Sequence, residues 1–123
     1  MNKHILCIDD DDTIQTLVEV SLPNYFVHKA KSLSEAEKEI AQFDFSGIVI
    51  DIHLPDGDGL RYLSKIMLSD KNKNTPVIVL SDHTEISNKV MAFNLGAEDF
   101  IGKPFDPIEL NARLTSKIKK LNL

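Results

Sequence analysis

The fold is decided by residues 48–59, which read IVIDIHLPDGDG. The segment opens with three β-branched residues that do not alternate with polar ones, a pattern typical of a parallel strand buried on both faces. The strand is expected to end at Asp51, and Pro55, Gly57 and Gly59 then allow the chain to bend tightly. The stretch therefore predicts a central parallel strand that delivers a carboxylate to one edge of the sheet.

Four further strands are predicted on either side of this one. Residues 5–8 and 77–80 are equally apolar runs, and weaker strands are expected at residues 25–28 and 99–101. Amphipathic helical stretches follow each strand. Strands alternating with helices imply right-handed crossovers and an α/β fold of stacked layers. We therefore expect a doubly wound (βα)5 three-layer sandwich with a five-stranded parallel sheet.

Local signals place the ends of the first two helices. The first is expected to take Asp12 as its N-cap and to stop before Pro23. The second is expected to follow Ser34, because Glu37 comes three residues later and completes a capping-box pattern.

The other three helices have equally clear boundaries. One is predicted at residues 58–69 and another at residues 85–95, ending at Gly96 as a left-handed stop. The last is expected to begin with Asp106 as N-cap and Pro107 as its first residue.

Composition favours one ordinary globular domain over residues 1–123, without linker or repeat. Hydrophobic residues make up 42% and charged residues 27% of the chain. The net charge of -5 argues against nucleic-acid binding by this domain, which needs clustered Lys and Arg. We expect neither a membrane-spanning segment nor a signal peptide, because no continuous apolar stretch is long enough and no apolar h-region follows residues 1–4. The single cysteine, Cys7, is expected in the core, and a cytoplasmic location is the expectation.

Chemically active side chains follow four of the five predicted strands. Asp9 and Asp10 follow the first strand and Asp51 the third, while Ser81 and Lys103 follow the fourth and fifth. In an open parallel sheet, ligands bind at the carboxyl ends of the strands. We therefore expect these side chains to converge on one site.

Such a site suits phosphoryl chemistry with a metal ion. Two carboxylates about 4 Å apart repel by roughly 4 kcal/mol at an effective dielectric constant of 20, so a group of three favours a divalent cation. Mg2+ prefers oxygen ligands and commonly completes its shell with phosphate. A nearby Asp is then a nucleophile toward phosphorus, with metal, Lys and Ser neutralising the transferred oxygens.

At these residues the chain resembles bacterial response-regulator receiver domains, over essentially its full length. The matching pieces are, in order, Ile8-Asp9-Asp10, residues 50–59, Ser81, Gly96-Ala97 and Lys103-Pro104-Phe105. The resemblance implies a flavodoxin-like strand order of 2-1-3-4-5. It also implies the function of a two-component phosphoprotein, which takes a phosphoryl group from a sensor histidine kinase and then switches its partner-binding face.

The resemblance assigns the acceptor and the metal ligands. Asp51 is implied to become the aspartylphosphate. Asp9, Asp10 and Asp51 are implied to hold Mg2+ together with the main-chain carbonyl of His53.

The resemblance also assigns a switch. Ser81 is implied to hydrogen-bond the phosphoryl group and Lys103 to pair with it. Phe100 is implied to turn inward when Ser81 moves, and the bond between Lys103 and Pro104 is implied to be cis.

Three residues depart from, or tune, the family pattern. Asp82 follows the hydroxyl residue, where the family usually has Ala or Gly. His53 and His83 each lie two residues beyond a site residue, at positions that in the family modulate the lifetime of the phosphoryl group. Our hypothesis is that His53, Asp82 and His83 together set an unusual lifetime.

The implied partners are proteins. They are a sensor histidine kinase or phosphotransfer protein and, through the face made by the fourth helix, fifth strand and fifth helix, a downstream protein or an output domain. A phosphorylation-dependent homodimer is a further expectation, and neither nucleic acid nor membrane is expected to bind. A stand-alone regulator and a piece of a longer protein both remain open.

Two alternatives compete with this interpretation. Asp9, Asp11 and Thr13 match the DxDxT motif of haloacid-dehalogenase-like phosphatases, in which Asp9 would be the nucleophile. That alternative leaves Asp51 without a purpose, and 123 residues is short for such an enzyme. The second alternative is a receiver that binds partners without being phosphorylated.

Because the receiver interpretation accounts for more of the residues than the phosphatase does, we expect a domain that is not an enzyme, beyond assisting its own phosphorylation and slow dephosphorylation.

Overall fold

The computed structural model describes residues 3–121 and contains the predicted parallel sheet. Its strands are β1 (His4–Ile8), β2 (Phe26–Ala30), β3 (Gly47–Ile50), β6 (Val77–Ser81) and β7 (Asp99–Gly102). They lie in the order β2-β1-β3-β6-β7, and all four pairings are parallel. Counted in chain order, this is the expected order 2-1-3-4-5. Two short strands, β4 (His53–Leu54) and β5 (Gly57–Asp58), form a separate antiparallel ribbon directly after the central strand.

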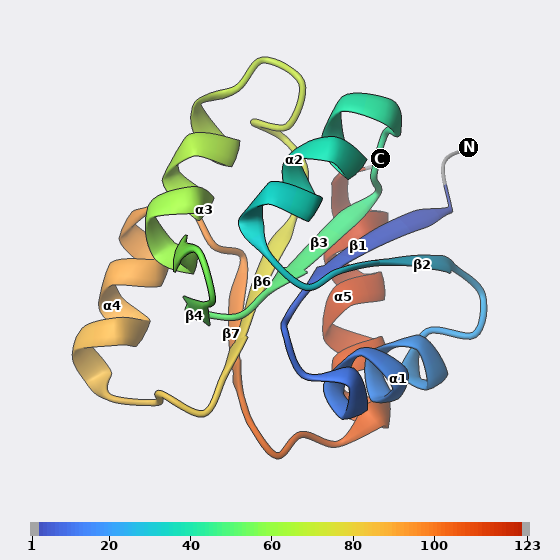
Figure 1. The fold of residues 1–123 in the computed structure, drawn as a ribbon. Coiled ribbons are helices and arrows are strands. Elements are labelled where there is room, and N and C mark those ends of the chain that lie inside the picture. Colours follow the sequence, from blue (N-terminus) through green and yellow to red (C-terminus); the bar gives the residue numbers. More distant parts are fainter. Residues whose placement is uncertain (1–2, 122–123) are drawn as a thin grey trace.

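Five helices of the described chain cover the two faces of the sheet (Figure 1). They are α1 (Asp12–Ser21), α2 (Leu33–Gln42), α3 (Gly59–Leu68), α4 (Ile86–Asn94) and α5 (Pro107–Leu121). Helices α1 and α5 lie on one face, and α2, α3 and α4 on the other. The predicted three-layer sandwich is confirmed.

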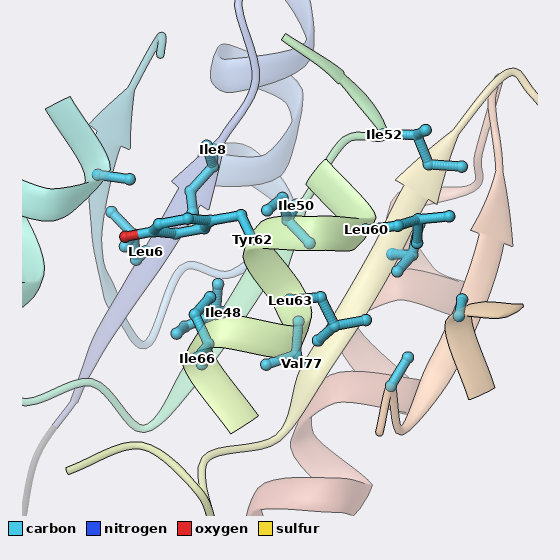
Figure 2. Packing of buried hydrophobic residues seen from close by; sticks show 14 of the residues in the cluster. Leu6, Ile8, Ile48, Ile50, Ile52, Leu60, Tyr62, Leu63, Ile66 and Val77 are labelled. Atoms are coloured by element: carbon cyan, nitrogen blue, oxygen red, sulfur yellow. The ribbon is translucent and has the colours of Figure 1, made fainter. Parts of the chain in front are cut away.

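The non-alternating strands are apolar because each of their faces is covered. In β1, Leu6 and Ile8 pack in the core cluster beneath α2 and α3, whereas Ile5 and Cys7 pack in the cluster beneath α1 and α5. Figure 2 shows the first of these clusters, where the apolar side chains of α3 lie over β1, β3 and β6. Cys7 is fully buried as expected, and burial raises the pKa of its thiol. The central strand β3 is likewise buried along its whole length, and Asp51 follows directly on its last residue.

The predicted start of the first helix is wrong by one residue. Asp11, not Asp12, is the N-cap, and its carboxylate accepts hydrogen bonds from the backbone N–H groups of Thr13 and Ile14 at 2.8 and 3.3 Å. The reason is that Asp11 is the last residue in extended conformation. Asp12 lies in the first turn and forms an ion pair of 2.6 Å with Lys31.

The predicted start of the second helix is wrong by two residues. Ser32 is the N-cap, and its hydroxyl accepts a 3.1 Å hydrogen bond from the N–H of Glu35. The N–H groups of Leu33 and Ser34 instead donate to the two carboxylate oxygens of Asp56, at 2.8 and 3.0 Å. Asp56 belongs to the loop between β4 and β5, so a tertiary contact completes this cap.

The other helix boundaries agree with the sequence. Gly96 follows α4 with a φ of 110°, a left-handed conformation that favours glycine. Asp106 precedes α5 and accepts a hydrogen bond of 2.8 Å from the N–H of Ile108. The bond between Lys103 and Pro104 is cis. Within residues 3–121, no helix combines the length and apolar character that a membrane crossing requires.

Candidate functional site at the carboxyl edge of the sheet

Three carboxylates meet where β1 and β3 end. One oxygen from each of Asp9, Asp10 and Asp51 lies within 4.8 Å of the others. Asp9 and Asp51 are buried, and Asp10 is exposed. The sequence placed these residues at two strand ends, and the pairing of β1 with β3 brings those ends together.

The backbone orients the two buried carboxylates. One oxygen of Asp9 accepts a 2.9 Å hydrogen bond from the N–H of Asp11, and one oxygen of Asp51 accepts a 2.7 Å hydrogen bond from the N–H of Ile52. The N–H of Asp51 in turn donates to the carbonyl of Ile8 at 3.0 Å, which links β3 to β1. In each side chain the other oxygen is thereby directed toward the centre of the site.

Lys103 brings a positive charge to that centre. Its Nζ lies 2.7 Å from Asp9 Oδ2 and 3.1 Å from Asp51 Oδ2. Burial alone would lower the pKa of Lys103, but the hydrogen bonds and charges of Asp9 and Asp51 raise it overall. Burial raises the pKa of Asp9, and the hydrogen bond from Lys103 opposes this effect. The two buried carboxylates therefore share one ion-pair partner, the ammonium group of Lys103.

The donor set also fits a hard divalent ion. All three side chains offer carboxylate oxygens, and their spacing allows one ion to contact all of them. Such ligands suit Mg2+ better than metals that prefer nitrogen or sulfur.

The predicted switch residues, Ser81 and Phe100, lie in β6 and β7, the two strands that follow β3 in the sheet. Ser81 is fully buried at the end of β6, and its Oγ accepts a 3.1 Å hydrogen bond from the N–H of His83. Phe100 in β7 is partly buried against the core beneath α3 and α4. The Nζ of Lys89, from α4, lies 5.9 Å from the centroid of the Phe100 ring. Phe100 therefore connects the sheet edge to α4.

The three residues expected to tune lifetime form a cluster. The rings of His53 and His83 meet edge to face, with centroids 4.0 Å apart. Asp82 is exposed, and its Oδ1 lies 3.4 Å from Nε2 of His83. The sequence placed each histidine two residues beyond a site residue, but only the fold shows that the two rings touch.

Gly59, the first residue of α3, lies directly against the backbone of Asp51. Its N–H donates a 2.6 Å hydrogen bond to the carbonyl of Ile52. A Cβ at this position would lie 1.9 Å from the carbonyl oxygen of Asp51. Only a residue without a side chain fits this position.

Gln15 is a supporting residue that the sequence reasoning missed. Its buried side-chain amide donates to the carbonyls of Cys7, Asp9 and Ala30 at 3.0, 2.9 and 3.1 Å. These hydrogen bonds join the ends of β1 and β2 around Asp9. The available signal was a polar side chain next to the apolar stripe of α1.

We expect Gln15→Leu to destabilise the fold and loosen the metal site. The substitution removes an amide donor from buried carbonyls, which costs about 1–3 kcal/mol. Urea unfolding should show this loss, and Mg2+ titration should show weaker binding. The exposed neighbour provides the control, Thr16→Ala. A stability of Gln15→Leu within about 0.5 kcal/mol of the wild type, as for an ordinary surface change, would contradict the assigned role.

Fold and site together define a class: a doubly wound α/β domain with a cluster of three carboxylates and a lysine at the carboxyl edge of its sheet. Comparison with known families makes this specific. The family described as "Response regulator receiver domain" matches residues 5–115. The chain belongs to this family, and it is a receiver domain of two-component response regulators, a generally non-enzymatic signalling class.

Individual proteins similar to this chain are also response regulators. Transcriptional regulatory protein SrrA from Staphylococcus aureus (strain NCTC 8325 / PS 47) is 32% identical over 98% of this chain and 49% of its own length. The chain thus spans about half the length of the curated relatives that it matches. A CheY-like response regulator receiver domain protein from Methanospirillum hungatei JF-1 is 27% identical, with a TM-score of 0.90 over 99% of this chain and 98% of that one.

A third relative was solved with ligands. It is a response regulator protein from Burkholderia pseudomallei whose structure contains a phosphorylated aspartic acid, a calcium ion and citrate. It is 25% identical, with a TM-score of 0.84 over 98% of this chain and 71% of that one.

Proposed function

We propose that this domain accepts a phosphoryl group on Asp51 from a sensor histidine kinase or phosphotransfer protein, in a Mg2+-dependent reaction, and then changes its affinity for a downstream partner. The observation that carries the proposal is the group of three carboxylates at the ends of β1 and β3, in which Lys103 bridges the buried pair Asp9 and Asp51. The phosphorylated aspartic acid and calcium ion of the Burkholderia relative support the same chemistry.

The proposed metal ligands are Asp9, Asp10, Asp51 and the main-chain carbonyl of His53. The first three already lie within reach of one ion. When bound, Mg2+ would neutralise charge on the phosphoryl oxygens during transfer.

In the proposed reaction, Asp51 is the nucleophile. Its Oδ1 is held by the N–H of Ile52, so Oδ2, which faces Lys103, is the oxygen that attacks. A bond forms between this oxygen and phosphorus as the bond between phosphorus and the donor's imidazole nitrogen breaks, and the released imidazole takes up a proton from solvent. Lys103, which already contacts Oδ2 at 3.1 Å, then pairs with the phosphoryl oxygens.

The proposed switch begins at Ser81. A phosphoryl group adds negative charge and strong acceptor oxygens next to Asp51, and the Ser81 hydroxyl leaves the N–H of His83 to bind one of them. Phe100 then fills the space vacated beside the core. Because Lys89 of α4 lies over Phe100, this movement reaches α4.

Helix α4 is well suited to respond. Ala92 is the one residue of α4 that is buried in the described chain. The N-cap of α4, Glu85, makes no side-chain capping hydrogen bond within residues 3–121. Exposed apolar side chains cover its outer surface, namely Ile86, Val90, Met91 and Phe93. We propose the face of α4, β7 and α5 as the surface that binds the downstream protein, an output domain or, after phosphorylation, a second copy.

For nearly all molecules to change state, phosphorylation must favour the active conformation over the inactive one by several kcal/mol.

We further propose that the cluster of His53, Asp82 and His83 sets the lifetime of the aspartylphosphate. Asp82→Ala should slow phosphate loss, because the substitution removes a carboxylate that repels the phosphoryl group. Exposed charges interact by up to about 1 kcal/mol, so a two- to fivefold slower rate is expected. The decay of labelled protein after removal of the phosphodonor measures this rate.

The control for this variant is Glu98→Ala, which removes an exposed carboxylate just before β7, away from the site. Its decay rate should match that of the wild type. An unchanged rate of phosphate loss in Asp82→Ala would show that Asp82 does not influence the lifetime of the aspartylphosphate.

The remaining assignments are also proposals. We propose that residues 1–123 act as one receiver unit in the cytoplasm, without direct contact to nucleic acid or membrane.

Labelling with acetyl phosphate, with and without Mg2+, tests the function as a whole. Labelling that requires Mg2+ supports it, and a chain that never incorporates phosphate would instead be a partner-binding receiver.

A further inference from the structure

The ribbon of β4 and β5, which follows directly after Asp51, is too short to hold itself in place. Each of its strands has two residues, and an isolated two-stranded hairpin is at best marginally stable in water. Its base is fixed beside the site, where the N–H of Gly59 donates a 2.6 Å hydrogen bond to the carbonyl of Ile52. Its tip, formed by Pro55 and Asp56, lies at the other end and therefore depends on contacts with another element.

Helix α2 holds this tip. One carboxylate oxygen of Asp56 accepts a 2.8 Å hydrogen bond from the N–H of Leu33, and the other accepts a 3.0 Å hydrogen bond from the N–H of Ser34. Both N–H groups belong to the first turn of α2, where the helix itself offers them no acceptor. These hydrogen bonds lower the pKa of Asp56. The carboxylate is therefore ionised, as the positive end of the helix dipole favours.

An apolar contact accompanies the two hydrogen bonds. A Cβ at Gly57 would lie 2.7 Å from Cδ1 of Leu33, so the backbone of the tip lies directly against this side chain. Leu33 and Leu54, one from α2 and one from the ribbon, both pack against the core cluster beneath α2 and α3. Polar and apolar contacts thus join the ribbon to α2.

His53 lies between the base and the tip of the ribbon. It is the first residue of β4, and its ring meets the ring of His83 edge to face, with centroids 4.0 Å apart. If the tip were released, the ribbon would be held at its base only. The ring and the carbonyl of His53 would then be free to move relative to Asp51.

We propose that Asp56 is a positioning residue of the phosphoacceptor site: it docks the ribbon on α2 and thereby fixes His53 relative to Asp51 and His83. This role rests on the proposed function, in which the carbonyl of His53 binds Mg2+ and its ring influences the lifetime of the aspartylphosphate. Both oxygens of Asp56 accept hydrogen bonds from α2. Asp56 therefore acts through His53 and is not itself a metal ligand.

The test compares Asp56→Ala with Ser32→Ala in the metal-free protein. Ser32 is the N-cap of α2, and its hydroxyl accepts a hydrogen bond from the N–H of Glu35 in the same helix, so its loss weakens α2 without releasing the ribbon. Both variants should unfold at a lower urea concentration than the wild type. Only Asp56→Ala should shift the NMR ring signals of His53 and His83 and speed amide exchange in β4 and β5 at least about tenfold. Asp56→Asn keeps one acceptor oxygen and should give intermediate values.

Mg2+ titration provides a second measurement. Asp56→Ala should bind Mg2+ about tenfold more weakly than the wild type, at the lower end of the range seen when a residue that supports a metal ligand is replaced. Ser32→Ala should retain the wild-type affinity. Ring signals or a Mg2+ affinity left unchanged by Asp56→Ala would overturn the assignment, as would equal changes in Ser32→Ala. Because the ring signals are read without metal, they test Asp56 independently, and a wild type that binds no Mg2+ would count against the proposed function alone.

Discussion

Asp51→Asn should abolish phosphorylation by acetyl phosphate or by a sensor kinase. The amide has nearly the shape of the carboxylate but lacks the anionic oxygen that attacks phosphorus. Removal of a nucleophile typically costs several orders of magnitude in rate, so we expect a loss of at least roughly 1,000-fold. Electrophoresis in a phosphate-binding gel measures the labelled fraction over time. The fold should persist, because Asn can still accept the hydrogen bond from the N–H of Ile52.

Asp12→Asn is the matched control for this variant. It removes the same charge at the same edge of the sheet, but from an exposed side chain that pairs with Lys31. Labelling of Asp12→Asn should remain near the wild-type rate. Persistent labelling of Asp51→Asn, together with loss of labelling in Asp9→Asn, would contradict our proposal and favour a phosphatase-like reaction on Asp9.

Gly59→Ala is expected to produce the largest loss of stability among the substitutions considered. The new Cβ would lie 1.9 Å from the carbonyl oxygen of Asp51 and 3.1 Å from the Cα of Ile52. Both are backbone atoms of the segment that holds the site, so the loop and the end of β3 must move apart. Overpacking typically costs about 1–3 kcal/mol, and we expect a loss near the upper end. Chemical denaturation measures it, and metal binding should weaken in parallel.

Gly57→Ala provides the comparison two residues earlier. There the added Cβ would meet Cδ1 of Leu33 at 2.7 Å, which is the end of a flexible side chain that can rotate away. The expected loss is about 0.5–1 kcal/mol. Equal losses for the two alanine variants would show that the tight contact between Gly59 and Asp51 is not what constrains this loop.

The fold was predictable because three of the five strands carry a clear local signal in the sequence. The apolar runs ending at Ile8, Ile50 and Leu80 reflect burial on both faces, which is a property of the residues themselves. Helix ends that depend on local chemistry, such as Gly96 and Asp106, were also predicted correctly. The start of α2 was not, because Ser32 caps the N–H of Glu35 two residues before the expected start, and Asp56 from a distant loop binds the next two N–H groups.

In the site, too, features set by strand order were predictable from the sequence, whereas features set by tertiary side-chain contacts were not. Residues at strand ends could be grouped from the sequence, because parallel strands bring their carboxyl ends to one edge. The clustering of Asp9, Asp10 and Asp51 follows from that rule. Contacts that depend on side-chain direction could not be predicted. Neither the ring contact between His53 and His83 nor the three hydrogen bonds of Gln15 leaves a spacing signal.

Mapping the phosphoryl group within the chain tests the central claim most directly. The protein is labelled with a small phosphodonor in Mg2+, the acyl phosphate is trapped by borohydride reduction, and peptide mass spectrometry locates the reduced residue. Our account predicts modification at Asp51 alone, and none when Mg2+ is removed by chelation. Reduction at Asp9, or labelling that is indifferent to the metal, would contradict it.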